Sequence, residues 1–99
     1  MLVRIKVLVS ERRYIITTHA LIRMSDRDVT TKDLMSLIAN GELNEEYPNR
    51  QPCPAALMLG FISSNPCHVV VAICGDQLSV ITVYWPDDEC WMNCRTRRL

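Results

Sequence analysis

The chain has 99 residues, of which 48% are hydrophobic, so it suits one domain, residues 1–99, with a single small core, and disorder is not expected. Eleven Lys and Arg residues balance eleven Asp and Glu residues, which gives a formal net charge of zero. This balance excludes a globally basic nucleic-acid-binding protein but leaves room for a local basic patch.

The sequence also bears on the compartment. No apolar run is long enough to span a bilayer, and the N-terminal stretch MLVRIKVLVSERR lacks the pattern of a signal peptide. The five cysteines are odd in number and scattered, which favours reduced thiols over a disulfide framework. We therefore expect a cytoplasmic protein that does not associate with a membrane.

Three patterns precede residue 30. Residues 1–10 are rich in Leu, Ile and Val and fit either a short helix or a strand. Residues 14–16, Tyr-Ile-Ile, are typical of a brief extended link. Thr17 or Thr18 then has the side chain expected of an N-cap, for a helix that runs to about residue 25.

The next pattern predicts a second helix. Thr30 is its expected N-cap, and Asp33 suits the first turn because the helix dipole is positive there. One side of this helix is apolar, through Leu34, Leu37 and Ile38. The pair Asn40-Gly41 predicts that the helix ends in a left-handed C-cap.

After Gly41 the pattern changes to strands, which we expect at residues 43–47, 56–62, 68–74 and 78–84. The stretch PNRQPCP predicts a loop and SSNP predicts a turn, while Gly75-Asp76-Gln77 predicts a hairpin and Pro86 ends the last strand. Helices followed by an antiparallel meander predict an α+β domain. Its N-terminal helices are expected to pack on one face of an antiparallel sheet of about four strands.

The stretch TTHALIRMSDR contains His19, Arg23 and Arg27 at intervals of four residues, so the three side chains share one helix face. Free N–H groups and the positive dipole end at the start of a helix favour a neutral imidazole at His19, as a general base requires. Arg23 has the planar fork that binds phosphate or carboxylate. The alternative is an ordinary polar face, with Asp26 and Asp28 as ion-pair partners.

Two further candidates lie in the predicted hairpin. His68 opens its first strand and Tyr84 closes its second, and an imidazole or a phenol can transfer a proton to or from a substrate. The alternative is structural: His68 is a partly buried histidine that hydrogen-bonds its neighbours, and Tyr84 and Trp85 only pack.

The C-terminal residues supply the basic patch and a weak metal alternative. Arg95, Arg97 and Arg98 follow the acidic run at residues 87–89 and are candidate phosphate contacts. Cys90 and Cys94 form a C-x3-C pair that Cys53, or Cys67 with His68, would complete as a zinc site. The spacing is not that of common structural zinc sites, so we predict no metal site and interpret the cysteines as buried or incidental thiols.

Several catalytic signatures are absent from the sequence. It has no Gly-rich phosphate loop, no G-x-S-x-G, no H-E-x-x-H and no paired-carboxylate signature. Nucleotide hydrolysis, serine hydrolysis and zinc proteolysis are therefore disfavoured.

The order of the motifs resembles a known family. The motifs are the stretch RRYIITTHALIRMSDRDVTTKDLMSLIANGELNEEYP, followed by PAALMLGF, PCHVVVAI and LSVITVYWPDDECW. They resemble the small bacterial family described as domain of unknown function 4258, with its H-A-x-x-R-M opening and N-G-E-[IL] helix exit. Later hallmarks of the family are a strand histidine and a terminal I-T-[VA]-Y-x-P strand followed by a tryptophan. The resemblance covers residues 12–91.

The resemblance implies a distant similarity to RelE/ParE-like and MqsR/BrnT-like toxins of toxin–antitoxin modules, and therefore a RelE-like fold. It further implies metal-independent cleavage of mRNA without a cofactor, with an antitoxin protein and mRNA or the ribosome as partners. His19 and Arg23 match the H-A-x-x-R-M motif, His68 matches the strand histidine, and Tyr84 matches the tyrosine of the terminal strand. Arg27 and the C-terminal arginines would contact RNA. The alternative function is a non-catalytic protein-binding module.

Overall fold

The computed structural model describes residues 1–98. The N-terminal half of the chain contains three helices, α1 (Leu2–Ser10), α2 (Thr18–Asp26) and α3 (Thr31–Asn40), with a short strand between the first two. The stretch that fitted either a helix or a strand is therefore helical. Ile5 and Leu8 are one helical turn apart and are both fully buried on the same side of α1. In a strand these two side chains would point to opposite faces, so only a helix buries both on one side. The helical part of the predicted order is confirmed.

The two predicted N-caps are confirmed. The Thr17 hydroxyl accepts a hydrogen bond from the backbone N–H of Ala20, and this bond begins α2. Thr30 and Asp33 form a reciprocal capping box at the start of α3, in which each side chain accepts from the other residue's backbone N–H. Local chemistry therefore positions both helices.

The predicted left-handed C-cap of α3 is wrong. Gly41 has φ −77° and ψ 173°, which is extended backbone rather than the left-handed region. A Cβ atom at this position would lie 2.5 Å from the Leu37 carbonyl oxygen and 2.8 Å from that of Leu59. The glycine is needed because helix and sheet approach closely there, and local sequence does not reveal such an approach.

The sheet has five strands in the order β1-β5-β4-β3-β2, from β1 (Tyr14–Ile16), β2 (Glu42–Tyr47), β3 (Ala55–Ile62), β4 (Asn65–Cys74) and β5 (Gln77–Tyr84). The α+β class is confirmed, whereas the sheet is mixed rather than antiparallel, because β1 pairs with β5 in parallel. The stretch predicted to be a link is thus an edge strand, recruited by a partner more than sixty positions away in the chain.

The hairpin turns follow the prediction with one shift of boundary. Ser63 and Ser64, with φ of 50° and 69°, make the two-residue turn between β3 and β4. β4 begins at Asn65, so His68 lies inside this strand. The prediction that His68 opens the strand is therefore wrong. The directly opposed neighbour of His68 on β5 is Tyr84.

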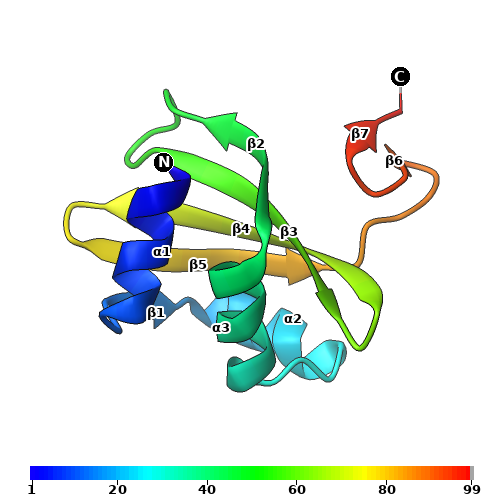
Figure 1. Ribbon diagram of the computed structural model, residues 1–99, viewed down its shortest axis with the longest axis horizontal. Helices are drawn as coiled ribbons and strands as arrows, with labels where there is room; N and C mark the ends of the chain where they lie inside the picture. Colours follow the sequence, from blue (N-terminus) through cyan, green and yellow to red (C-terminus); the bar gives the residue numbers. More distant parts are fainter. Residues whose placement is uncertain (99) are drawn as a thin grey trace.

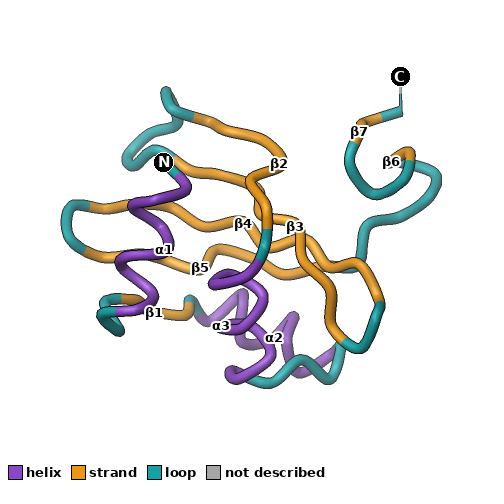
Figure 2. The backbone as a smooth tube through the Cα atoms, in the orientation of Figure 1, coloured by secondary structure: helices purple, strands orange, loops and turns teal. Residues whose placement is uncertain are grey.

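The two faces of the sheet have different covers (Figures 1 and 2). We call the side packed against α1, α2 and α3 the helix face, and it holds the main apolar cluster. Strand residues of this cluster are Ala56, Met58, Cys67, Val69, Val71, Leu78, Val80 and Val83. Alternate residues of the same strands, such as His68 and Leu57, point to the other side, which we call the tail face.

The C-terminal segment, residues 86–98, leaves the sheet after β5 and forms a hairpin of β6 (Trp91–Met92) and β7 (Thr96–Arg97). Figure 1 shows this hairpin away from the three helices, at the other end of the molecule from α1. None of the helices within residues 1–98 has the length and apolar character required to cross a membrane.

The expectation that all cysteines are reduced is wrong for two of them. Cys53 and Cys74 are joined by a disulfide, with their Cα atoms 5.3 Å apart. The loop after β2 returns beside the end of β4, where the backbone N–H of Ile73 donates to the Pro54 carbonyl oxygen at 2.9 Å. Strand register therefore brings the two thiols together, and spacing along the chain did not predict that.

Candidate functional site on the tail face

The predicted site residues fall into two groups, one on α2 and one on the sheet. His19 is exposed in the first turn of α2, and α2 packs against β5. The His19 Nε2 atom lies 3.1 Å from the Thr82 hydroxyl oxygen. Thr82 and Tyr84 are two residues apart on β5 and so project from the same face of the sheet. His19 therefore reaches the strand face that also carries Tyr84.

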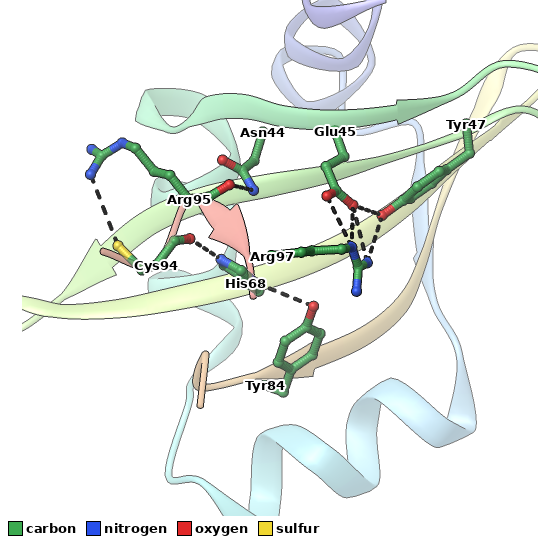
Figure 3. Close-up of polar contacts among 8 residues, drawn as sticks. All are labelled: Asn44, Glu45, Tyr47, His68, Tyr84, Cys94, Arg95 and Arg97. Atoms are coloured by element: carbon green, nitrogen blue, oxygen red, sulfur yellow. Dashed lines mark hydrogen bonds and ion pairs between the residues drawn. The ribbon is translucent and has the colours of Figure 1, made fainter. Parts of the chain in front are cut away.

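His68 is fully buried on the tail face, and both of its ring nitrogens have partners (Figure 3). Its Nδ1 lies 3.2 Å from the Tyr84 hydroxyl oxygen, and its Nε2 lies 2.7 Å from the Cys94 carbonyl oxygen. The Tyr84 ring and the Trp91 ring both meet the imidazole edge-on, with centroids 5.2 Å and 4.5 Å away. The histidine is therefore enclosed by a strand neighbour and by the C-terminal segment.

The two bonds of His68 determine which atom donates. Burial lowers the pKa of His68, so the ring is neutral at pH 7 and carries a single proton. A carbonyl oxygen only accepts, so that proton lies on Nε2, which donates to Cys94. The bare Nδ1 then accepts from the Tyr84 hydroxyl, whose own pKa is raised by burial. Contact with the C-terminal segment therefore commits the Tyr84 proton to His68.

A second polar cluster lies beside this pair. Arg97 contacts Glu45 through two nitrogens, with Nε 3.0 Å from Oε2, and the Tyr47 hydroxyl donates to the same carboxylate. Burial raises the pKa of Glu45, but the hydrogen bonds from Arg97 and Tyr47 outweigh it, so the pKa is lower than usual. The Arg97 guanidinium also lies 4.5 Å from the centroid of the Trp91 ring. The carboxylate is thus charged and paired.

The predicted phosphate contacts differ in their availability. Arg23 is half exposed and only loosely paired, at 4.0 Å from Asp26. Arg27 follows α2 and lies near Cys67 on the helix face, where burial raises the pKa of the Cys67 thiol to about 12 and the charge of Arg27 opposes that rise. Of these two arginines, Arg23 is the one in helical register with His19 and free to bind an anion.

The C-terminal arginines are already engaged with the protein itself. Arg95 pairs with Glu42 at 2.8 Å, Arg97 pairs with Glu45, and Arg98 donates to the backbone carbonyl oxygen of Asp88. They do not form the free basic patch that their sequence suggests. To contact phosphate they must first leave these partners.

The zinc alternative has no donor set in the described chain. Cys67 and His68 are adjacent on β4, so their side chains point to opposite faces, and Cys53 is bonded to Cys74. Within residues 1–98, three or more His, Cys, Asp or Glu side chains do not gather at any place that would hold a metal ion.

Sequence reasoning missed four residues of this site: Thr82, Glu45, Tyr47 and Trp91. A usable signal existed for the first three, because Thr82 precedes Tyr84 by two positions and Glu45 and Tyr47 alternate on β2. Trp91 was visible only as the tryptophan that follows the terminal strand in the family resemblance. Its contact with His68 had no sequence signal, since the two residues are 23 positions apart and meet only in the folded chain.

Comparison with known protein families confirms the family resemblance that the sequence motifs indicated. The family model described as domain of unknown function 4258 (DUF4258) matches residues 16–85, which include His19, His68, Thr82 and Tyr84. No curated protein matches the chain significantly. The matched residues make up most of the chain, and the protein belongs to the family of domain of unknown function 4258.

Proposed function

We propose that the protein is a metal-independent endoribonuclease of the toxin type found in toxin–antitoxin modules. One observation carries the proposal: His19 reaches Thr82, and Thr82 shares a strand face with Tyr84, which is bonded to His68. Groups that accept and donate protons thus line one side of the sheet, with Arg23 one helical turn from His19. The RelE-like arrangement implied by the resemblance stays a prediction.

RNA is the substrate class that suits this set of groups, because it contains its own nucleophile. In the proposed reaction His19 takes the proton of a ribose 2′-OH, whose oxygen attacks the adjacent phosphorus. Tyr84 protonates the leaving 5′-oxygen, and the products are a 2′,3′-cyclic phosphate and a 5′-hydroxyl. Proton transfer of this kind contributes about 10²- to 10⁴-fold to the rate. No metal ion is needed to create the nucleophile.

Arg23 is the proposed electrostatic element. Its guanidinium is half exposed and 4.0 Å from Asp26, a separation at which an exposed ion pair is weak. A phosphate that accepts two hydrogen bonds from the planar fork would compete well for it. Charge that builds on the phosphate oxygens during attack is then stabilised where it develops.

The proposal is tested with purified full-length protein and a fluorescent RNA in the presence of a metal chelator. We expect fragments with cyclic phosphate ends, and a loss of about 10²-fold or more with His19→Asn and with Tyr84→Phe. Tyr14→Phe is the matched control, since it removes a phenolic hydroxyl from β1 instead of β5. Equal cleavage by Tyr84→Phe and Tyr14→Phe would remove Tyr84 from the mechanism.

Expression in a bacterium tests the toxin part of the proposal. We expect growth arrest that is abolished by His19→Ala with Arg23→Ala, while the variant protein stays folded. Arrest that survives both substitutions contradicts the proposed chemistry. The proposed cellular partners are an antitoxin protein and mRNA or the ribosome.

A second candidate, a non-catalytic protein-binding module, is favoured by a separate observation. Leu21 and Ile22 on α2 are 50% and 55% exposed, and His68 is sealed by its two hydrogen bonds. A binding module predicts a stable complex with a protein partner and no RNA fragments. Substitution of Leu21 and Ile22 with serine would abolish that complex and leave a ribonuclease active.

A further inference from the structure

The cover of His68 comes from outside residues 16–85, the stretch that the family model matches. The family match ends at residue 85, whereas Trp91 and Cys94, which close the site, belong to the C-terminal segment. The site is therefore built by one part of the chain and closed by another.

Two contacts close the site directly. Trp91 is 3% exposed and its ring packs edge-on against the imidazole of His68. The Cys94 carbonyl oxygen accepts a hydrogen bond from Nε2 of the same ring. With these groups in position a substrate cannot reach Nε2 of His68, and the Tyr84 proton is held by Nδ1.

Apart from buried Trp91, the attachments of the C-terminal segment are polar and of a kind that exchanges readily. Two ion pairs tie it to β2, Arg95 with Glu42 and Arg97 with Glu45, and the Asn44 side chain donates to the Arg95 carbonyl oxygen at 3.2 Å. Both arginines have about half of their side chains exposed, so water and salt weaken the pairs. The hairpin itself has strands of only two residues, too short to be stable alone.

The main apolar cluster does not depend on the C-terminal segment. That cluster lies on the helix face, and none of its residues comes from positions 86–98. Release of the segment would therefore open the tail face while the helix face stays packed. Opening would also free Arg95 and Arg97 from their carboxylate partners, and free guanidinium groups bind phosphate.

We propose that the C-terminal segment, residues 86–98, is a displaceable cover that controls access to His68 and, through the His68 ring, the availability of the Tyr84 proton. When the cover is closed, His68 is inaccessible and the Tyr84 hydroxyl donates to it. When the cover opens, His68 faces solvent and its Nε2 loses its fixed acceptor. The consequence for catalysis rests on the proposed ribonuclease function, whereas the opening itself does not.

Histidine acylation by diethyl pyrocarbonate, followed by peptide mass spectrometry, tests the cover in the full-length protein. The chain has two histidines, so exposed His19 serves as the internal reference for buried His68. In the wild type we expect His68 to react at least roughly tenfold more slowly than His19, because a buried group reacts only through local opening. In Trp91→Ala with Arg97→Ala we expect the two rates to become similar.

The matched control is Trp85→Ala with Arg4→Ala, which removes an exposed tryptophan and an exposed ion pair that do not touch His68. It should leave His68 protected. A second variant, Glu42→Gln with Glu45→Gln, removes the ion-pair partners on β2 and so loosens the same cover. This second variant is used in place of the first if the first does not unfold cooperatively in urea. Protection of His68 that persists in the folded cover variant, or reactivity equal to His19 in the wild type, would overturn the proposal.

RNA cleavage by the same proteins separates the cover from the function. Faster cleavage in the variants with accessible His68 supports both proposals. Accessible His68 with no cleavage by any variant leaves the cover standing and contradicts the ribonuclease. Cleavage by a wild type in which His68 is already as reactive as His19 contradicts the cover alone.

Discussion

The two faces of one sheet are held in different ways. The helix face is closed by apolar side chains from three helices, and residues such as Leu34, Ile38 and Val69 are fully buried there. The tail face around His68 is closed by a short hairpin through two ion pairs, one aromatic contact and hydrogen bonds from sheet side chains to hairpin carbonyl oxygens. Apolar burial is insensitive to salt and pH, whereas ion pairs and a buried imidazole respond to both. The difference separates the part of the molecule that keeps it folded from the part that can change.

The largest expected effect tests the helix face. Leu34→Ala should lower the free energy of unfolding by about 2–5 kcal/mol, because it removes a fully buried side chain and leaves a cavity between α3 and the sheet. Urea denaturation followed by circular dichroism measures the change. Leu21→Ala is the matched control, since Leu21 is 50% exposed on α2 and should change stability by less than about 0.5 kcal/mol. Equal losses for both variants would contradict the assigned core.

A smaller effect is expected from pH on the tail face. Burial lowers the pKa of His68 below the ordinary 6.5, so the unfolded chain binds a proton that the folded chain does not. Stability should therefore fall as pH drops below about 6.5 and level off once pH passes the lower folded pKa. Urea midpoints between pH 7 and pH 5 measure this slope, and His68→Gln should flatten it. An unchanged slope in His68→Gln would contradict the assignment.

A carboxyl group, that of Glu45, acts at lower pH on the same face. The pKa of Glu45 is lowered because its hydrogen bonds from Arg97 and Tyr47 outweigh burial, so its contribution to stability is present above pH 4.5. It should be lost as pH falls through the folded pKa. Glu45→Gln should remove the pH dependence below 4.5 and leave the dependence due to His68. The effect of His68 thus begins below about pH 6.5 and that of Glu45 below pH 4.5.

The smallest effect compares ion pairs on the two sides of the molecule. Arg97→Gln should lower the free energy of unfolding by only about 0.2–1 kcal/mol, because the side chain is more than half exposed. Arg4→Gln, which breaks the exposed pair with Asp76, is the control and should cost less, since Arg97 also stacks on Trp91. A loss above about 2 kcal/mol for Arg97→Gln would mean that the tail face is part of the global core.

The comparison of faces also explains which predictions succeeded. The caps at Thr17 and Thr30 were readable from sequence because each cap involves residues within three positions of one another. The strand patterns and the hairpin turns were equally local, and the strands predicted after Gly41 are present in the structure. Strand β1 and the Cys53–Cys74 disulfide were not readable, because their partners are distant in the chain.

The candidate site divides along the same line. The sequence pointed to His19, Arg23, His68 and Tyr84 as groups able to handle a phosphate, and helical spacing already aligned the first two. It did not indicate that His19 meets Thr82, or that the C-terminal arginines are bound to Glu42 and Glu45. An arginine run looks free in a sequence, because its partners are chosen by the tertiary fold.

The sequence by itself determined helices α2 and α3, their N-caps, the hairpins and the α+β class, since these follow from interactions between near neighbours in the chain. Only the tertiary structure decided that the sheet is mixed, that Gly41 is extended, and that Trp91 and Cys94 close over His68. The physical reason is the same in each case. These features depend on which distant segments meet, and that choice is made by burial of the whole chain rather than by any local pattern.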